Sequence, residues 1–319
     1  MGTPSRPPFD PDVAHALATR DDIVTTMRPD EIPRLRRQMI TYSESEITLD
    51  GSFELSRHRS MGLDGEVTIV LLRPRSATAP APVIYHVHGG GLVLGTAYDV
   101  LPSLAPLAVQ VGAAIAAVEY RLAPEHRYPA AVEDVYTGLE WLSASAADLG
   151  LDADRIVIDG VSAGGGLAAA AALLARDRGG PHLLGQMLIC PMLDDRNDSE
   201  SGWQMAGVGA WDRTANETGW SAYLGDIPRS EVPIYAAPGR AVDLSGLPPT
   251  FIDVGSAETF RDEDIDYATR IWRAGGDAEL HVWPGGAHGF DALVPAAPLS
   301  RDARTARVRW LERLLDQPR

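Results

Sequence analysis

The 319-residue chain contains no lysine, because all 28 of its lysine-plus-arginine positions are arginine. Without an ε-amine the chain cannot form a Schiff base, provide the lysine of a phosphate-binding loop or build a serine–lysine dyad. Its single cysteine, Cys190, excludes an internal disulfide and a cysteine-based metal cluster. A serine nucleophile in this protein would therefore have to be activated by histidine.

Positive charge is scarce overall, since 44 acidic residues give a net charge of -16 and a pI of about 4.8. So acidic a protein repels phosphate backbones and anionic lipid headgroups, so we expect neither a nucleic-acid nor a membrane partner. The longest apolar stretch, 166–175, is mostly alanine and too short to span a bilayer. The first residues lack the apolar region of a signal peptide, and we expect a cytoplasmic location.

Short apolar runs alternate with helical stretches over most of the chain. The expected strands are 66–73, 82–87, 113–120, 155–160, 186–191, 249–254 and 278–283. The expected helices are 100–111, 130–149, 162–176, 260–274 and 301–315. Several of the strands are apolar on both faces, which is typical of a parallel sheet between two helical layers. The alternation therefore predicts an α/β fold with a doubly wound, mostly parallel central sheet.

Two segments interrupt this alternation, and we interpret both as parts of a helical cap. Residues 1–45 precede the first strand, and residues 195–240 form an insertion between two core strands. The catalytic core would then consist of 46–194 and 241–319.

The insertion is rich in large apolar side chains, which predict a substrate pocket. These are Trp203, Met205, Trp211 and Trp220. The alternative, that they only fill the small core of the cap itself, stays open at this point.

The strongest chemical signal is Gly160-Val161-Ser162-Ala163-Gly164, directly after a strand and directly before an alanine-rich helix. In a G-x-S-x-G elbow the turn is so tight that the flanking glycines are required, and the serine hydroxyl is left accessible. The backbone N–H of Ala163 would face the same space.

A competing interpretation is the dinucleotide fingerprint G-x-G-x-x-A over 164–169. That motif requires an acidic residue about 20 positions on, at the end of the next strand. The first acidic residue after the next expected strand is Asp194, 30 positions beyond Gly164. The nucleophile elbow is therefore the better interpretation.

A second signal is His88-Gly89-Gly90-Gly91, at the end of an expected strand. Consecutive glycines let the backbone approach a ligand, and their N–H groups can stabilise an oxyanion. We expect the donors to be Gly89 and Gly90, together with Ala163. His86 and His88 also form H-x-H, but no further ligands follow at a metal-site spacing, so we predict no metal.

The base and its orienting acid are sought among residues that follow the later strands. His288 follows the last expected strand, and the order serine, acid, histidine is that of α/β-hydrolases. Glu258 fits the acid position after strand 249–254, with Asp262 one helical turn later as the second choice. Asp253 within that strand and Asp291 after the histidine are weaker candidates.

These motifs together resemble the bacterial hormone-sensitive-lipase family of α/β-hydrolase carboxylesterases. The matching segments are the His88 motif, 120–126 with 128–131 and Asp134, Ser162-Ala163-Gly164-Gly165, and His288-Gly289-Phe290. They extend over about 66–315. Two departures are Val161, where the family usually has Asp or Thr, and Glu258-Thr259-Phe260, where many members read Asp-Pro-Leu.

The resemblance implies an α/β-hydrolase fold and hydrolysis of short- to medium-chain esters through an acyl-enzyme. Ser162 would be the nucleophile, His288 the base and Glu258 the acid, and no cofactor is implied. The expected partner is a small-molecule ester, with no stable membrane anchoring, and a homodimer through the C-terminal helix stays open. The alternatives are an amidase or lactonase with the same triad, and a non-catalytic receptor for a small ligand.

Overall fold

The computed structural model describes residues 5–62, 65–77 and 80–316, and these contain one eight-stranded sheet. Its strands lie in the order β1-β2-β4-β3-β5-β6-β7-β8. Their bounds are β1 Phe53–Gly62, β2 Gly65–Pro74, β3 Ala81–Val87, β4 Ala114–Glu119, β5 Leu151–Val161, β6 Gly185–Ile189, β7 Thr250–Gly255 and β8 Ala278–Trp283. The strands from β4 to β8 in this order pair in parallel, whereas β2 pairs antiparallel with both β1 and β4. The predicted fold class is confirmed.

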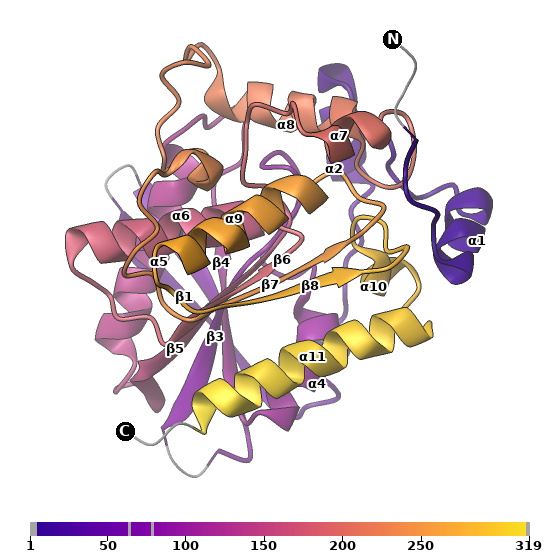
Figure 1. The fold of residues 1–319 in the computed structure, drawn as a ribbon. Coiled ribbons are helices and arrows are strands. Elements are labelled where there is room, and N and C mark those ends of the chain that lie inside the picture. The colour runs from indigo at the N-terminus through magenta and orange to yellow at the C-terminus, as the bar shows by residue number, and fades with distance from the viewer. Residues whose placement is uncertain (1–4, 63–64, 78–79, 317–319) are drawn as a thin grey trace.

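Helices cover both faces of the sheet (Figure 1). One core cluster joins α5 Ala130–Ser145, α6 Ala163–Arg178 and α9 Arg261–Arg273 to one face. A second cluster joins α4 Leu101–Gln110 and α11 Pro298–Leu315 to the other. The strands β3 to β7 are buried along almost their whole length, because both faces are covered. This arrangement brings the carboxyl ends of the parallel strands to one edge, where ligands bind in such folds.

Two segments far apart in sequence pack together beside that edge (Figure 1). The N-terminal segment carries α1 Pro11–Thr19, η1 Pro29–Glu31, α2 Ile32–Arg37 and α3 Glu44–Ile47. The insertion carries α7 Glu200–Gln204, α8 Arg213–Leu224 and η2 Pro238–Arg240, and α10 Phe290–Leu293 follows the last strand. The backbone N–H of Trp211 donates to the Val24 carbonyl at 2.9 Å, and the Thr218 hydroxyl donates to the Met27 carbonyl at 2.7 Å. The two segments therefore form one layer.

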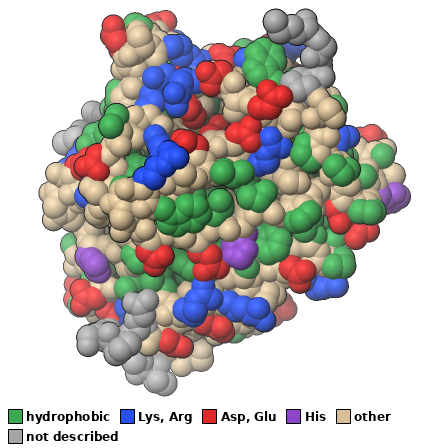
Figure 2. Space-filling view, in the orientation of Figure 1, with side chains coloured by type: hydrophobic (Ala, Val, Ile, Leu, Met, Phe, Trp, Pro, Cys, Tyr) green, Lys and Arg blue, Asp and Glu red, His purple; other side chains and the backbone are tan. Residues whose placement is uncertain are grey.

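Acidic and arginine side chains are interspersed over the face seen in Figure 2, with apolar side chains between them. None of the helices in the described part of the chain combines the length and apolar composition that crossing a membrane requires.

Candidate active site

Ser162 lies at a sharp turn between β5 and α6. Its backbone has φ 58° and ψ −122°, a region that costs free energy for any residue with a side chain. The turn closes tightly, since a Cβ on Gly160 would lie 2.2 Å from the Gly164 carbonyl oxygen. A Cβ on Gly164 would lie 2.1 Å from the Val87 carbonyl oxygen. Gly160 is thus required because the elbow closes on itself, and Gly164 because the elbow packs against the end of β3.

His288 lies between Ser162 and Glu258 and is hydrogen-bonded to both. Its Nε2 is 3.0 Å from the Ser162 Oγ, and its Nδ1 is 2.9 Å from a Glu258 carboxylate oxygen. The other Glu258 oxygen accepts the Phe260 N–H at 2.8 Å, and the carboxylate is 1% exposed. The edge-on ring of Phe260, 5.2 Å from the imidazole, further limits how His288 can rotate. The structure thus brings together all three residues that the sequence indicated.

The loop after β3 lies directly against the nucleophile turn. A Cβ on Gly89 would be 2.9 Å from the Val161 carbonyl oxygen and 3.4 Å from the Ser162 Cβ. Gly90 has φ 113°, and its carbonyl accepts the Leu94 N–H at 2.8 Å. Of the predicted oxyanion donors, Gly89 therefore lies against the serine, and Ala163 follows the serine directly in the chain.

His88 braces this loop. Its Nδ1 donates to the Gly89 carbonyl at 2.8 Å, and its ring stacks on Tyr120 at a centroid distance of 4.0 Å. The Tyr120 hydroxyl donates back to the His88 carbonyl at 2.9 Å. Burial lowers the pKa of His88 to about 3, so this imidazole is neutral at ordinary pH. The other histidine of H-x-H, His86, is hydrogen-bonded to buried Asp159 at 2.5 Å.

The four predicted pocket residues lie in different surroundings. The Trp211 indole packs against the loop 88–91 after β3, which we call the oxyanion loop. A Cβ on Gly91 would lie 2.1 Å from the Trp211 ring. Trp220 and Met205 are each 1% exposed. Trp203 is 46% exposed and lies under the guanidinium of Arg213, 3.7 Å from its ring centre.

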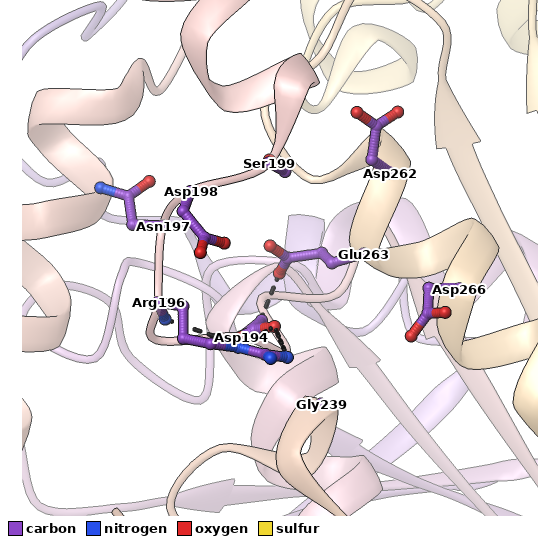
Figure 3. A pocket seen from close by; sticks show the side chains of 9 residues that line it. All are labelled: Asp194, Arg196, Asn197, Asp198, Ser199, Gly239, Asp262, Glu263 and Asp266. Carbon is purple, nitrogen blue, oxygen red and sulfur yellow. Dashed lines mark hydrogen bonds and ion pairs between the residues drawn. The ribbon is translucent and has the colours of Figure 1, made fainter. Parts of the chain in front are cut away.

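The other candidate acids are engaged elsewhere. The Asp262 carboxylate accepts the Ser201 N–H at 2.8 Å and pairs with Arg261. Asp262 also lines an acidic cavity of about 300 Å³, shown in Figure 3, where it extends away from Glu263. Asp253 and Asp291 both form ion pairs with the buried Arg307. Glu258 is thus the one of the four to which the structure gives a hydrogen bond with His288.

Three further residues contact this site to which the sequence analysis assigned no site role. Tyr120 stacks on His88, and Thr259 donates to the Trp211 carbonyl at 2.7 Å beside the acid. The Cys190 sulfur lies within 4.8 Å of ligand atoms of both Glu258 and His288. In the sequence Cys190 falls within the expected strand 186–191, where no pattern marks it as a site residue; the structure ends β6 at Ile189.

Comparison with known proteins identifies the family of the chain. Residues 84–292 match the family model of the alpha/beta hydrolase fold. The carboxylesterase NlhH of Mycobacterium tuberculosis is 34% identical over 321 residues, covering 98% of each chain. The esterase LipI of the same organism is 36% identical over 225 residues, covering 70% of each chain.

Two solved structures agree with the chain along almost its full length. A bacterial heroin esterase superposes with a TM-score of 0.87 at 36% identity, covering 97% of this chain and 98% of the other. The esterase LipW from Mycobacterium marinum superposes with a TM-score of 0.86 at 33% identity, covering 98% and 99%. The chain therefore belongs to the hormone-sensitive-lipase group of the α/β-hydrolase family and to the class of carboxylester hydrolases, as its motifs predicted.

Proposed function

We propose that this protein hydrolyses short- to medium-chain carboxylic esters through an acyl-enzyme on Ser162. The observation that carries the proposal is the continuous hydrogen-bonded series Ser162 Oγ, His288 Nε2, His288 Nδ1 and Glu258. A serine hydroxyl is a weak nucleophile unless a base removes its proton during attack. The hydrogen bond between His288 Nε2 and the Ser162 Oγ supports His288 as that base.

In the acylation step the Ser162 Oγ attacks the ester carbonyl carbon while its proton passes to His288 Nε2. The Glu258 carboxylate accepts the Nδ1–H, which fixes the tautomer and stabilises the imidazolium that forms. The backbone N–H groups of Gly89, Gly90 and Ala163 stabilise the negative charge that develops on the former carbonyl oxygen. His288 then gives its proton to the leaving alcohol as the carbon–oxygen bond breaks.

In the deacylation step a water molecule takes the place of the alcohol. His288 accepts a water proton as the water oxygen attacks the acyl carbon, and the same backbone donors stabilise the second oxyanion. Collapse returns the proton to Ser162 and releases the carboxylic acid. Apart from the leaving alcohol and the attacking water, the proton donors and acceptors of the cycle are Ser162 and His288.

The expected limit on the acyl chain follows from the surroundings of Ser162. Only 5% of this residue is exposed, and the Trp211 ring packs on Gly91 beside the oxyanion donors. A neutral ester also suits a protein with a net charge of -16, since an anionic substrate would be repelled. We assign Trp211 as the substrate-facing member of the predicted pocket set.

The two segments 1–45 and 195–240 are proposed to form the cap over this site, with 46–194 and 241–319 as the core. The first four residues of the N-terminal segment lie outside the described part of the chain. Support comes from Trp211, which is held by the Val24 carbonyl on one side and by Thr259 on the other. The cap thereby contacts both the oxyanion loop and the loop after β7 that carries Glu258 and Thr259.

The test is hydrolysis of p-nitrophenyl acetate, butyrate and laurate by the wild-type protein and Ser162→Ala. We expect the acetate and butyrate to be cleaved, the laurate to be cleaved much more slowly, and Ser162→Ala to lose at least about 10³-fold in kcat. Acetanilide measured beside phenyl acetate separates ester from amide preference. Equal rates for the two proteins would contradict the assignment of Ser162.

A further inference from the structure

Cys190 lies beneath the catalytic histidine, at a place that the hydrolytic cycle does not use. It directly follows β6, and its backbone N–H donates to the Asp253 carbonyl at 2.7 Å. The residue is 4% exposed, and its sulfur lies within 4.8 Å of a ring nitrogen of His288. The side chain is thus buried between the strand ends and the loop that carries His288.

The Cys190 sulfur, a Glu258 carboxylate oxygen and a ring nitrogen of His288 all lie within 4.8 Å of one another. Of the possible His288 atoms, Nδ1 is the one that faces the carboxylate, at 2.9 Å. A tetrahedral Zn²⁺ with bonds of about 2.0–2.3 Å has ligand atoms about 3.5 Å apart. Small side-chain movements would therefore bring these three atoms onto one ion.

The three ligand types also suit one class of cation. Thiolate and imidazole ligands select Zn²⁺ and softer ions over Mg²⁺, and a single carboxylate is a common third ligand. A thiolate and a carboxylate together neutralise a divalent charge, which a buried site requires. We propose that Cys190 Sγ, Glu258 and His288 Nδ1 bind a thiophilic divalent cation, and that this ion inhibits the esterase.

The inhibition follows from the proton balance at His288. In the resting site Nδ1 carries the proton and donates to Glu258, so Nε2 is free to accept the proton of Ser162. An ion on the Nδ1 lone pair requires that proton to reside on Nε2 instead. Nε2–H can then only donate to the Ser162 Oγ, and the serine loses its base. The Cys190 thiol gives its proton to solvent, so one proton is released for each ion bound.

Burial raises the pKa of the Cys190 thiol well above its usual range, and the Glu258 carboxylate adds to the effect. The thiol is therefore protonated in the resting enzyme and inert as a nucleophile. Binding of the cation must displace this proton.

The single cysteine of the chain makes a direct test possible. Any ultraviolet charge-transfer absorption between a thiolate and Cd²⁺ in the full-length protein must come from Cys190. We expect this band to saturate at one equivalent of CdCl₂, both in the wild-type protein and in Ser162→Ala, which keeps all three ligands. His288→Ala should weaken Cd²⁺ binding at least about tenfold. Absence of the band from the wild-type protein would overturn the proposal, whatever its esterase activity.

Inhibition of ester hydrolysis by the cation rests on the proposed function, and it is measured in a separate experiment. With p-nitrophenyl acetate, ZnCl₂ and CdCl₂ should inhibit reversibly, EDTA should restore the rate, and MgCl₂ should have no effect. Cys190→Ser, normalised to its own metal-free rate, should need at least about tenfold more Cd²⁺ for half-inhibition. Equal inhibition of the two proteins would overturn the role of Cys190. A wild-type protein without esterase activity that still shows the Cd²⁺ band would contradict the proposed function and leave the cation site standing.

Discussion

Glu258 and Asp262 are four positions apart, yet the structure gives them different chemistry. Glu258 is buried and accepts hydrogen bonds from His288 and from the Phe260 N–H. Asp262 is engaged by Ser201 and Arg261 at the acidic cavity. A carboxylate next to the imidazole stabilises the imidazolium, whereas one bound elsewhere cannot.

Glu258→Gln is expected to lower kcat by about 10³–10⁴-fold, because an amide can present its N–H to Nδ1 and favour the wrong tautomer. Asp262→Asn, the matched control, should keep kcat within about threefold, since it keeps the size and one acceptor of the side chain. Steady-state kinetics with p-nitrophenyl butyrate provide the comparison. A larger loss in Asp262→Asn than in Glu258→Gln would reverse the assignment.

His88 provides a prediction for stability. Its pKa is about 3 in the folded protein, against 6.5 for an unperturbed histidine, so the unfolded chain binds more protons between these two values. The folded state therefore loses stability as the pH falls from about 6.5 towards 3. Relative to His88→Asn, the wild-type free energy of unfolding should drop by roughly 2–3 kcal/mol between pH 7 and pH 4.5.

Urea unfolding of both proteins at the two pH values measures this difference. The other titrating groups are shared by the two proteins and cancel. A difference that does not change with pH would mean that His88 titrates normally in the folded protein.

Among the structural elements, the insertion 195–240 packs directly on the oxyanion loop. The Trp211 ring packs on Gly91, and a Cβ on Gly219 of α8 would lie 2.6 Å from the Gly91 carbonyl oxygen. Gly91 itself has φ 59°. The loop proposed to provide the oxyanion donors is therefore in direct contact with the insertion, and we expect its position to depend on that contact.

Gly91→Ala should lower kcat/KM about 10²-fold, because the new methyl group displaces either Trp211 or the oxyanion loop. Gly179→Ala is the control, since Gly179 also has a positive φ, of 80°, but its Cβ would meet no atom within 4 Å. That variant should lose about 1 kcal/mol of stability and keep its activity. Similar kinetic losses in both variants would show that backbone strain alone, and not the contact with Trp211, matters.

The elements of the core were predictable because strands buried on both faces and glycine-marked turns leave strong patterns. The expected strand 155–160 corresponds to β5, and the expected helix 260–274 to α9. The strand β1 was missed because residues 56–60 are all polar, so the sequence shows no alternation of apolar and polar residues there. The strand has little burial and lies at the edge of the sheet, paired with β2. Its position depends on tertiary pairing that local pattern does not encode.

At the scale of the whole molecule, the N-terminal segment is tied to the core beside the site. The Arg36 guanidinium donates to the Val93 carbonyl at 2.7 Å and to the Ala123 carbonyl at 2.6 Å. Val93 follows the oxyanion glycines and Ala123 follows β4. One arginine therefore joins the N-terminal segment to two loops at the carboxyl edge of the sheet.

Arg36→Ala is expected to lower the free energy of unfolding by about 2 kcal/mol, since charged hydrogen bonds to partly buried carbonyls are lost. Arg34→Ala is the matched control on the same helix, because Arg34 is half-exposed and its hydrogen bonds are to nearby Gln38 and Glu31. It should change stability by no more than about 0.5 kcal/mol. Chemical denaturation measures the free energy of unfolding of both variants. Equal losses would argue against a stabilising role of the Arg36 hydrogen bonds to the two loops.

How the site residues come together was only partly predictable, because a local sequence pattern does not encode tertiary packing. Ser162, Glu258 and His288 each follow a strand of the parallel sheet, so their meeting at one edge follows from topology. The places of Trp203, Trp211 and Cys190 depend on how the insertion and the strand ends pack in three dimensions. Composition of a segment cannot distinguish a tryptophan against the oxyanion loop from one at the surface.

The central claim is that Ser162 is the nucleophile of an esterase, and covalent labelling tests it most directly. A p-nitrophenyl phosphonate should release one equivalent of p-nitrophenol, abolish ester hydrolysis in proportion, and leave its phosphonyl group on Ser162 in peptide mass mapping. Ser162→Ala should take up no label. A label on another residue that accounts for the lost activity, or unchanged hydrolysis by the fully labelled protein, would contradict the account.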